Sequence, residues 1–117
     1  TVPGALEIPL ALSQAVKASL IGSDEADARF DGAIALGCVI RGETTHYEAV
    51  AGECASGIQQ AQLETGVPIA FGALTVENLD QALARSEGPG GHNVGEDGAK
   101  VAVEMAMLVR RVRDGAR

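Results

Sequence analysis

The sequence predicts an α/β protein in which a parallel sheet is covered by helices on both faces. Apolar runs at 32–40 and 68–74 do not alternate with polar residues, which is typical of strands buried on both faces of such a sheet. Segments with helical periodicity lie before, between and after these runs, so helices and strands alternate along the chain. The length of 117 residues is enough for one domain with one core. We therefore expect a three-layer αβα sandwich that forms a single domain over 1–117.

The composition agrees with this prediction and excludes several classes of protein. Hydrophobic residues make up 46% of the chain, and the mean hydropathy is +0.12. The formal net charge of −7 leaves no basic field for nucleic acid or an anionic membrane surface. No apolar run approaches the length of about 18 residues that a membrane-spanning helix needs. We expect a cytoplasmic protein, with Cys38 and Cys54 as buried, reduced thiols because they form no CxxC or zinc-ligand pattern.

The first half of the chain contains one helix, a loop and the first strand. Pro9 suits the start of a helix in which Leu12, Val16 and Leu20 form the apolar stripe. The polar segment 21–31 is predicted to be a loop that leads into the strand at 32–40.

A long helix is expected from Thr45 to about residue 65. Thr45 and Glu48 have the spacing of a capping box, and Gly66 supplies a C-terminal stop. The apolar stripe of this helix consists of Tyr47, Val50, Cys54, Ile58 and Ala61.

The last part of the chain is predicted to contain a strand, a short helix and a long helix. Pro68 is tolerable as the first residue of the strand, and Asn78 with Gln81 caps the short helix. A glycine-rich loop at 86–93 precedes the final helix. That helix carries Val101, Met105, Leu108 and Val112 on one face and ends in Arg110, Arg111 and Arg113.

The start of the chain suggests a missing unit. It opens without Met on the turn-forming Pro3-Gly4, and two strands make a thin sheet. We therefore expect an upstream βα unit of roughly 30 or more residues to precede Thr1 in the whole protein.

The segment after the first strand is the best candidate for an anion site. A strand ending at Ile40 runs through Gly42 into a helix start at Thr44-Thr45, where free N–H groups and the helix dipole favour a phosphate. A tight turn with an ordinary cap is the alternative. His46 lies in the first helical turn and can donate to a phosphate or move protons, although a surface histidine is equally consistent.

Four other residues have both a structural and a functional interpretation. Glu7 caps the coming helix or accepts hydroxyl groups of a ligand, and Asp97 caps the last helix or orients an imidazole. Arg85 complements a helix dipole or clamps a phosphate. Phe71, which we expect at a strand end, packs in the core or lies flat against a heterocycle. His92, in the glycine-rich loop, is expected to be solvated.

Taken together, several segments resemble the lumazine synthase (6,7-dimethyl-8-ribityllumazine synthase) family. They occur in the family's order and cover essentially the whole chain. The matching segments are Val2-Pro3-Gly4-Ala5-Leu6-Glu7-Ile8-Pro9, Ala35-Leu36-Gly37-Cys38-Val39-Ile40-Arg41-Gly42-Glu43-Thr44-Thr45-His46-Tyr47, Pro68-Ile69-Ala70-Phe71-Gly72-Ala73-Leu74-Thr75 and Asn93-Val94-Gly95-Glu96-Asp97.

The resemblance implies a flavodoxin-like fold whose first βα unit is missing from this chain. It also implies an enzyme of riboflavin biosynthesis that uses no metal or organic cofactor. The family condenses 5-amino-6-ribitylaminouracil with 3,4-dihydroxy-2-butanone 4-phosphate to give 6,7-dimethyl-8-ribityllumazine, with release of phosphate and water.

Matching the motifs residue by residue implies a role for each site residue. The substrate-binding residues are Ala5, Leu6, Glu7, Val39, Ile40 and Phe71. The phosphate-binding residues are Glu43, Thr44 and Arg85. His46 is implied as the catalytic proton shuttle and Asp97 as the residue that orients it. Because the family's site lies between two subunits, Phe71 and Arg85 are expected to come from a neighbouring copy.

Two departures from the family pattern affect the prediction. The family's first strand and helix, which include an aromatic residue that stacks on the pyrimidine, precede Thr1, so this chain alone would have an incomplete site. Many members have a lysine where this chain has Val94, so a cation near the substrates is missing. The run from His92 to Asp97 resembles a variant of fungal, pentameric members, and the loop at 86–93 is longer than in the shell-forming type. We therefore expect a pentamer with small-molecule substrates. The alternative is a non-catalytic flavin-binding, lumazine-binding or shell-forming protein on the same scaffold.

Overall fold

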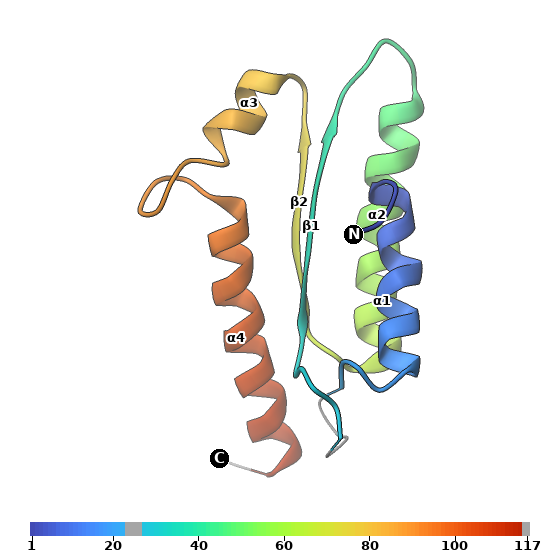
Figure 1. Ribbon diagram of the computed structural model, residues 1–117, viewed down its shortest axis with the longest axis vertical. Helices are drawn as coiled ribbons and strands as arrows, with labels where there is room; N and C mark the ends of the chain where they lie inside the picture. Colours follow the sequence, from blue (N-terminus) through green and yellow to red (C-terminus); the bar gives the residue numbers. More distant parts are fainter. Residues whose placement is uncertain (23–26, 116–117) are drawn as a thin grey trace.

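The computed structural model describes residues 1–22 and 27–115 and has three layers (Figure 1). In chain order the elements are the 3₁₀ helix η1 (Ala5–Glu7), α1 (Ile8–Lys17), β1 (Ala33–Ile40), α2 (His46–Thr65), β2 (Ile69–Val76), α3 (Leu79–Ala84) and α4 (Val94–Arg113). Helices α1 and α2 lie on one side of the two strands, and α3 and α4 lie on the other. The predicted α/β, αβα arrangement is confirmed, and it fits a flavodoxin-like fold.

The sheet consists of β1 and β2, which run parallel and in register from the pair Ala33–Ile69 to the pair Ile40–Val76. Both predicted strands are confirmed, although β2 begins after Pro68 and extends to Val76. Pro68 lacks an N–H group, but its carbonyl accepts a hydrogen bond of 2.9 Å from the N–H of Ala33. Because the strands are parallel, both end at the same edge of the sheet, where the candidate anion site was predicted.

The core lies between the sheet and the layer of α1 and α2. Its buried residues are Ile8, Ala35, Cys54, Ile58, Ala61, Ile69 and Ala73. The predicted apolar stripe of α2 is therefore confirmed over its central turns. The prediction for α1 extended too far, because the helix ends at Lys17 and Ser19 takes a left-handed backbone conformation with φ of 57°. Leu20 thus lies beyond the helix.

Helix α4 packs on the opposite face of the sheet through small residues. Gly98 is buried, and a Cβ atom there would lie 3.1 Å from Cγ2 of Ile34. The predicted stripe of Val101, Met105, Leu108 and Val112 is exposed in this chain. Gly98 permits the close approach of α4 to the sheet, and the four residues of the predicted stripe remain exposed.

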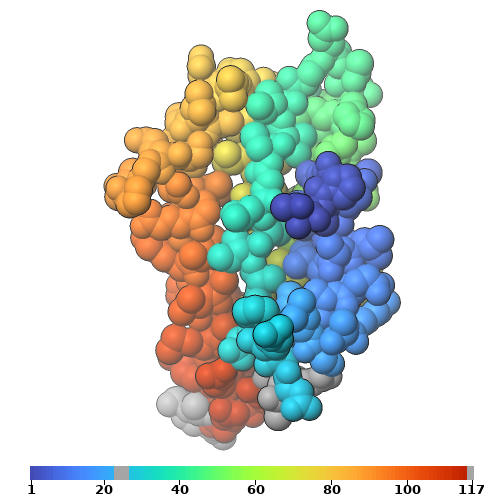
Figure 2. Space-filling view, viewed as in Figure 1, coloured from blue at the N-terminus to red at the C-terminus, as the bar shows by residue number. Residues whose placement is uncertain are grey.

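The prediction that β1 is buried on both faces is wrong for this chain. Leu36 is 61% exposed, and Ile34 and Ile40 are also exposed. Among the described residues β1 has a neighbour on one edge only, and a groove of about 670 Å³ opens between it and α4. In Figure 2, β1 is visible along its length between α4 and α1. Cys38, on this strand, is also exposed, so only Cys54 fits the predicted buried thiol.

Two predicted helix ends are confirmed: Gly66 ends α2 with φ of 71°, and the side chain of Asn78 caps α3. The prediction that Asp97 caps the last helix is wrong, because the side chain of Asn93 accepts from the N–H of Glu96 and caps α4.

Thr45 is the N-cap residue of α2, but its side chain makes no capping hydrogen bond. The predicted capping box is therefore absent. The carboxylate of Glu48 instead pairs with Arg41, a charged partner that competes with a backbone amide.

The predicted loops contain no helix or strand where the structure describes them. Residues 23–26 of the predicted 21–31 loop lie outside the described residues, and Ile21 bridges to Phe30 across them. In the described part of the chain, no helix is long and apolar enough to cross a membrane.

Candidate functional site

A cleft of about 280 Å³ lies at the carboxyl edge of the sheet. Its walls come from η1, the end of β1, the loop that follows β1 and the first turns of α2. The lining residues are Ala5, Cys38, Val39, Ile40, Gly42, Thr44, His46, Tyr47 and Val50. Residues separated by more than thirty positions in the sequence, Ala5 and Val39, thus meet in one cleft.

The polar end of the cleft is formed by the loop at 42–45 and the start of α2. His46 is the first residue of this 20-residue helix, and its backbone N–H donates to Oγ1 of Thr44 at 3.3 Å. A Cβ atom at Gly42 would meet no heavy atom within 4 Å, so this side of the loop is open. An anion seated here would meet the positive end of the α2 dipole.

Arg41, directly before this loop, forms ion pairs with Glu48 after the loop and with Glu77 after the neighbouring strand. Its Nε atom lies 2.8 Å from Oε2 of Glu77, and its Nη1 atom donates to Oε1 of Glu48. The guanidinium carbon lies 4.5 Å from the centroid of the Tyr47 ring. The hydrogen bond to Glu48 raises the pKa of Arg41 above its ordinary value and lowers the pKa of Glu48.

The apolar end of the cleft contains three of the predicted substrate-binding residues, Ala5, Val39 and Ile40. Leu6 and Glu7 adjoin it on η1 and are exposed, but they do not line it. Glu7 occupies the N-cap position of α1 without a capping hydrogen bond from its side chain. The structural interpretation of Glu7 as a cap therefore has no hydrogen bond to support it.

Of the three predicted phosphate-binding residues, only Thr44 lines the cleft. Glu43 is exposed on the same loop, beside Thr44. Arg85 lies at the C-terminal end of α3, where its Nη1 atom donates to the carbonyl oxygen of Gln81 at 2.9 Å. Within this chain, Arg85 thus has the contact expected from complementing a helix end.

Phe71 and Asp97 also lie outside the cleft. Phe71 is the third residue of β2, pairs with Ala35 and is 44% exposed, so the expectation that it stands at a strand end is wrong. Asp97 lies in the first turn of α4, where Asn93 supplies the cap. Helices α2 and α4 cover opposite faces of the sheet (Figure 1), and no hydrogen bond or ion pair of the described residues joins Asp97 to His46.

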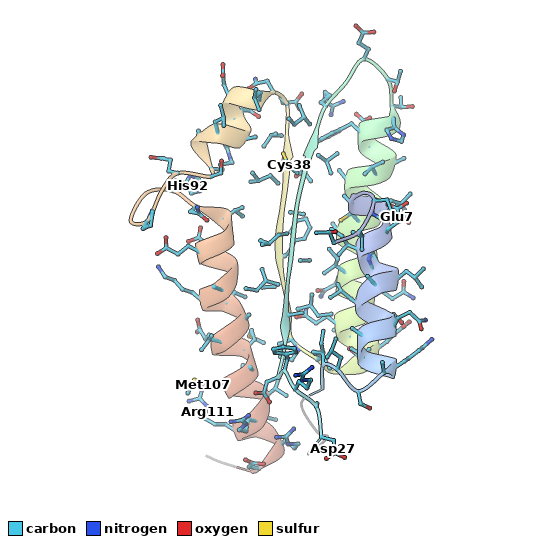
Figure 3. The ribbon with its side chains drawn as sticks, viewed as in Figure 1. Glu7, Asp27, Cys38, His92, Met107 and Arg111 are labelled. Carbon is cyan, nitrogen blue, oxygen red and sulfur yellow. The ribbon has the colours of Figure 1, made fainter. Side chains whose placement is uncertain are left out.

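The second histidine is separate from the candidate site. Figure 3 shows Glu7 beside α2 and His92 across the sheet, in the loop that precedes α4. His92 is exposed, as predicted. Over residues 1–22 and 27–115, no group of three His, Cys, Asp or Glu side chains is arranged to hold a metal ion.

Sequence reasoning missed several residues of the cleft. Tyr47 and Val50 were assigned to the buried stripe of α2, but both are only partly buried and line the cleft. Arg41, which adjoins the cleft without lining it, belonged to a matching motif but had no predicted role. Arg41 directly follows the first predicted strand and Glu48 lies in the first turn of the next helix, so the local order is compatible with their pairing. Glu77 is distant in the sequence, and no local pattern indicates its contact with Arg41.

Comparison with known proteins gives a consistent result. Residues 1–110 match the model of the 6,7-dimethyl-8-ribityllumazine synthase family. The chain is 48% identical over 110 residues to the 6,7-dimethyl-8-ribityllumazine synthase of Chlorobium luteolum, covering 94% of this chain and 64% of that protein. It is 49% identical over 111 residues to the synthase of Paracidovorax citrulli, covering 95% of this chain and 63% of the relative.

The synthase of Azoarcus sp. is 49% identical over 110 residues, which cover 94% of this chain and 62% of the relative. The chain thus spans less than two thirds of the length of these relatives. The family match covers most of this chain and includes every residue of the cleft. On this evidence, the chain belongs to the 6,7-dimethyl-8-ribityllumazine synthase family.

Proposed function

We propose that the protein carrying this chain is an enzyme of riboflavin biosynthesis. It condenses 5-amino-6-ribitylaminouracil with 3,4-dihydroxy-2-butanone 4-phosphate to form 6,7-dimethyl-8-ribityllumazine. The observation that carries the proposal is the single cleft that joins Ala5, Ile40, Thr44 and His46. It places an apolar wall for a heterocycle beside the helix start that favours a phosphate.

The phosphate of the four-carbon substrate binds at the loop between β1 and α2. The backbone N–H groups of Glu43 and Thr44 and the hydroxyl of Thr44 serve as donors. Gly42 leaves the loop surface open for close approach. The positive end of the α2 dipole attracts the phosphate at this point, although the net charge of the chain is negative.

His46 moves protons beside this phosphate. The amine of the pyrimidine attacks the ketone, and loss of water gives an imine. Elimination then releases inorganic phosphate, and attack of the second amine closes the ring with loss of another water. An imidazole at the first residue of α2 can accept a proton during these steps and return it to the leaving groups.

The pyrimidine lies against Val39 and Ile40, and the ribityl chain extends toward η1. Glu7 accepts hydrogen bonds from its hydroxyl groups, and Ala5 and Leu6 contact the ligand. Glu7 is exposed and its side chain makes no capping hydrogen bond, so its carboxylate is available for this role.

Phe71, Arg85 and Asp97 take part through a neighbouring copy of the chain in a homo-oligomer, for which we propose a pentamer. Phe71 exposes 44% of its surface on β2, so its ring is accessible to a neighbouring copy. Arg85 grips the phosphate from the neighbour, and Asp97 orients the imidazole. We further propose that this oligomer is cytoplasmic.

The assay that tests the proposal mixes the two substrates with the complete protein and follows lumazine absorbance. We expect product with no added metal or cofactor. Binding of lumazine-like compounds without turnover at millimolar substrate would instead favour the non-catalytic alternative. Val94, the half-buried first residue of α4 at a position where many members carry lysine, is the feature that favours that alternative.

A further inference from the structure

We propose that Arg41 is a positioning residue that holds the loop at 42–45 and the start of α2 in the shape that receives the phosphate. The proposal rests on the function proposed above for its chemical purpose. The contacts that carry it come from three separate elements: the end of β1, the end of β2 and the first turn of α2.

The backbone of Arg41 is fixed by the sheet. It is the first residue after β1, and its N–H donates to the carbonyl oxygen of Val76 at 2.8 Å. This bond continues the pairing of the strands beyond Ile40. The side chain therefore leaves from a defined point at the sheet edge.

The guanidinium then reaches across the edge in two directions. Its Nε atom lies 2.8 Å from the Glu77 carboxylate, directly after β2, and its Nη1 atom donates to Glu48 in α2. The Cζ atom of the group lies over the ring of Tyr47, the neighbour of His46 in the chain. An arginine can make all three contacts at once because its donors form a planar fork, whereas a lysine ammonium is a single point charge.

Few hydrogen bonds of the described residues hold the loop at 42–45. In the described chain, its hydrogen bonds all lead to the first turn of α2: Oγ1 of Thr44 accepts from His46, and the carbonyl of Thr45 accepts from Glu48 and Ala49. Arg41 therefore fixes the start of the loop at 42–45, which follows β1. Through Tyr47 and Glu48 it also fixes the end of the loop, which precedes α2.

Arg41 is a poor candidate for a direct phosphate ligand. Two carboxylates already accept from its Nε and Nη1 atoms, and one guanidinium with two carboxylates carries a net charge of −1. Arg41 is also absent from the lining of the cleft, whereas Tyr47, beneath its guanidinium, is present. These observations point to a role exerted through the loop.

The test uses the fluorescence of Tyr47 in the complete protein. This chain contains one tyrosine and no tryptophan, so any Tyr47 signal is assigned directly if the remainder of the protein is free of both or is corrected by a Tyr47→Phe blank. Emission and acrylamide quenching are compared for wild type, Arg41→Gln, Arg41→Lys and Glu77→Gln. The matched control is Arg110→Gln, which breaks the exposed pair with Asp31 at 3.0 Å on another part of the surface.

Without ligand, we expect more efficient quenching of Tyr47 in all three cluster variants and no change in Arg110→Gln. Titration with inorganic phosphate should show weaker binding in Arg41→Gln, by up to about fivefold, the range of an exposed ion-pair network. Arg41→Lys should not restore the wild-type values, because it keeps the charge but loses the fork.

Glu77→Gln separates positioning from direct binding. If Arg41 holds the loop, this variant binds phosphate more weakly or equally. Stronger phosphate binding in Glu77→Gln that disappears when Arg41 is also changed to Gln would instead identify a freed Arg41 as a ligand and overturn the proposal. Wild-type quenching and affinity in both Arg41 variants would also overturn it. Failure of wild type itself to bind phosphate would contradict the proposed function, while the quenching of Tyr47 would still decide whether Arg41 holds the loop.

Discussion

Pro9 of α1 packs directly over Gly57 of α2, and a Cβ atom at Gly57 would lie 2.6 Å from Cγ of Pro9. No real Cβ atom tolerates that distance, so one of the two helices would have to move. This contact sets how closely α1 approaches α2, and therefore where η1 places Ala5 at the wall of the cleft.

We expect Gly57→Ala to destabilise the protein by about 1–3 kcal/mol, the usual cost of overpacking. Alanine is the better helix former by about 1 kcal/mol, so a loss of stability would show that packing outweighs propensity. Gly52→Ala is the matched control, because it lies in the same helix with nothing within 4 Å of the added Cβ. Urea unfolding should place the two variants on opposite sides of wild type. Equal stabilisation by both would contradict the close contact.

The ion pair of Glu48 with Arg41 predicts a dependence of stability on pH. The hydrogen bond from Arg41 lowers the pKa of Glu48 below its ordinary value of 4.5 in the folded state. The stabilisation is therefore complete above pH 4.5 and is lost as the pH falls through the lower, folded pKa. The difference in Tm between wild type and Glu48→Gln should be largest near neutral pH and shrink in acid. Glu53→Gln, which removes an exposed carboxylate from the same helix, is the matched control for the loss of a charge from α2.

His46→Ala should slow lumazine formation by roughly 10²-fold, the lower range for loss of a general acid–base group. His92 is the other histidine of this chain, and it lies across the sheet from the cleft. Because His92 lies between Arg85 and Asp97 in the sequence, on the face proposed to meet the neighbouring copy, the control is Arg110→Gln, which breaks only an exposed pair with Asp31 and should retain wild-type kcat. Comparable rates for the two variants would remove His46 from the mechanism.

The two cysteines should differ in reactivity toward a disulfide reagent. Cys54 is 1% exposed, and burial raises the pKa of its thiol, so both access and thiolate content are reduced. Cys38 is exposed on β1. We expect rapid modification of Cys38 in the native chain and modification of Cys54 only on unfolding, and Cys38→Ser should abolish the rapid phase. Rapid reaction of the Cys38→Ser variant would indicate that the core around Cys54 opens readily.

The sequence alone was sufficient to predict most elements of the fold. Runs of apolar residues and the cap signals of Asn78 and Gly66 act over a few positions, so they can be recognised without knowledge of the tertiary structure. The same is true of the turn from Ile40 through Gly42 to His46, because a strand, a glycine and a helix start follow one another directly.

The tertiary structure decided what those local signals could not. Glu48 had the spacing of a capping box, but the fold brought Arg41 and Glu77 beside it, and an ion pair replaced the cap. Phe71 and Asp97 were placed away from His46, because the position of a side chain on a sheet or helix face depends on how the elements pack. Local signals act between neighbours in the chain, whereas charge pairing and burial act between neighbours in space, and only the folded chain determines which residues those are.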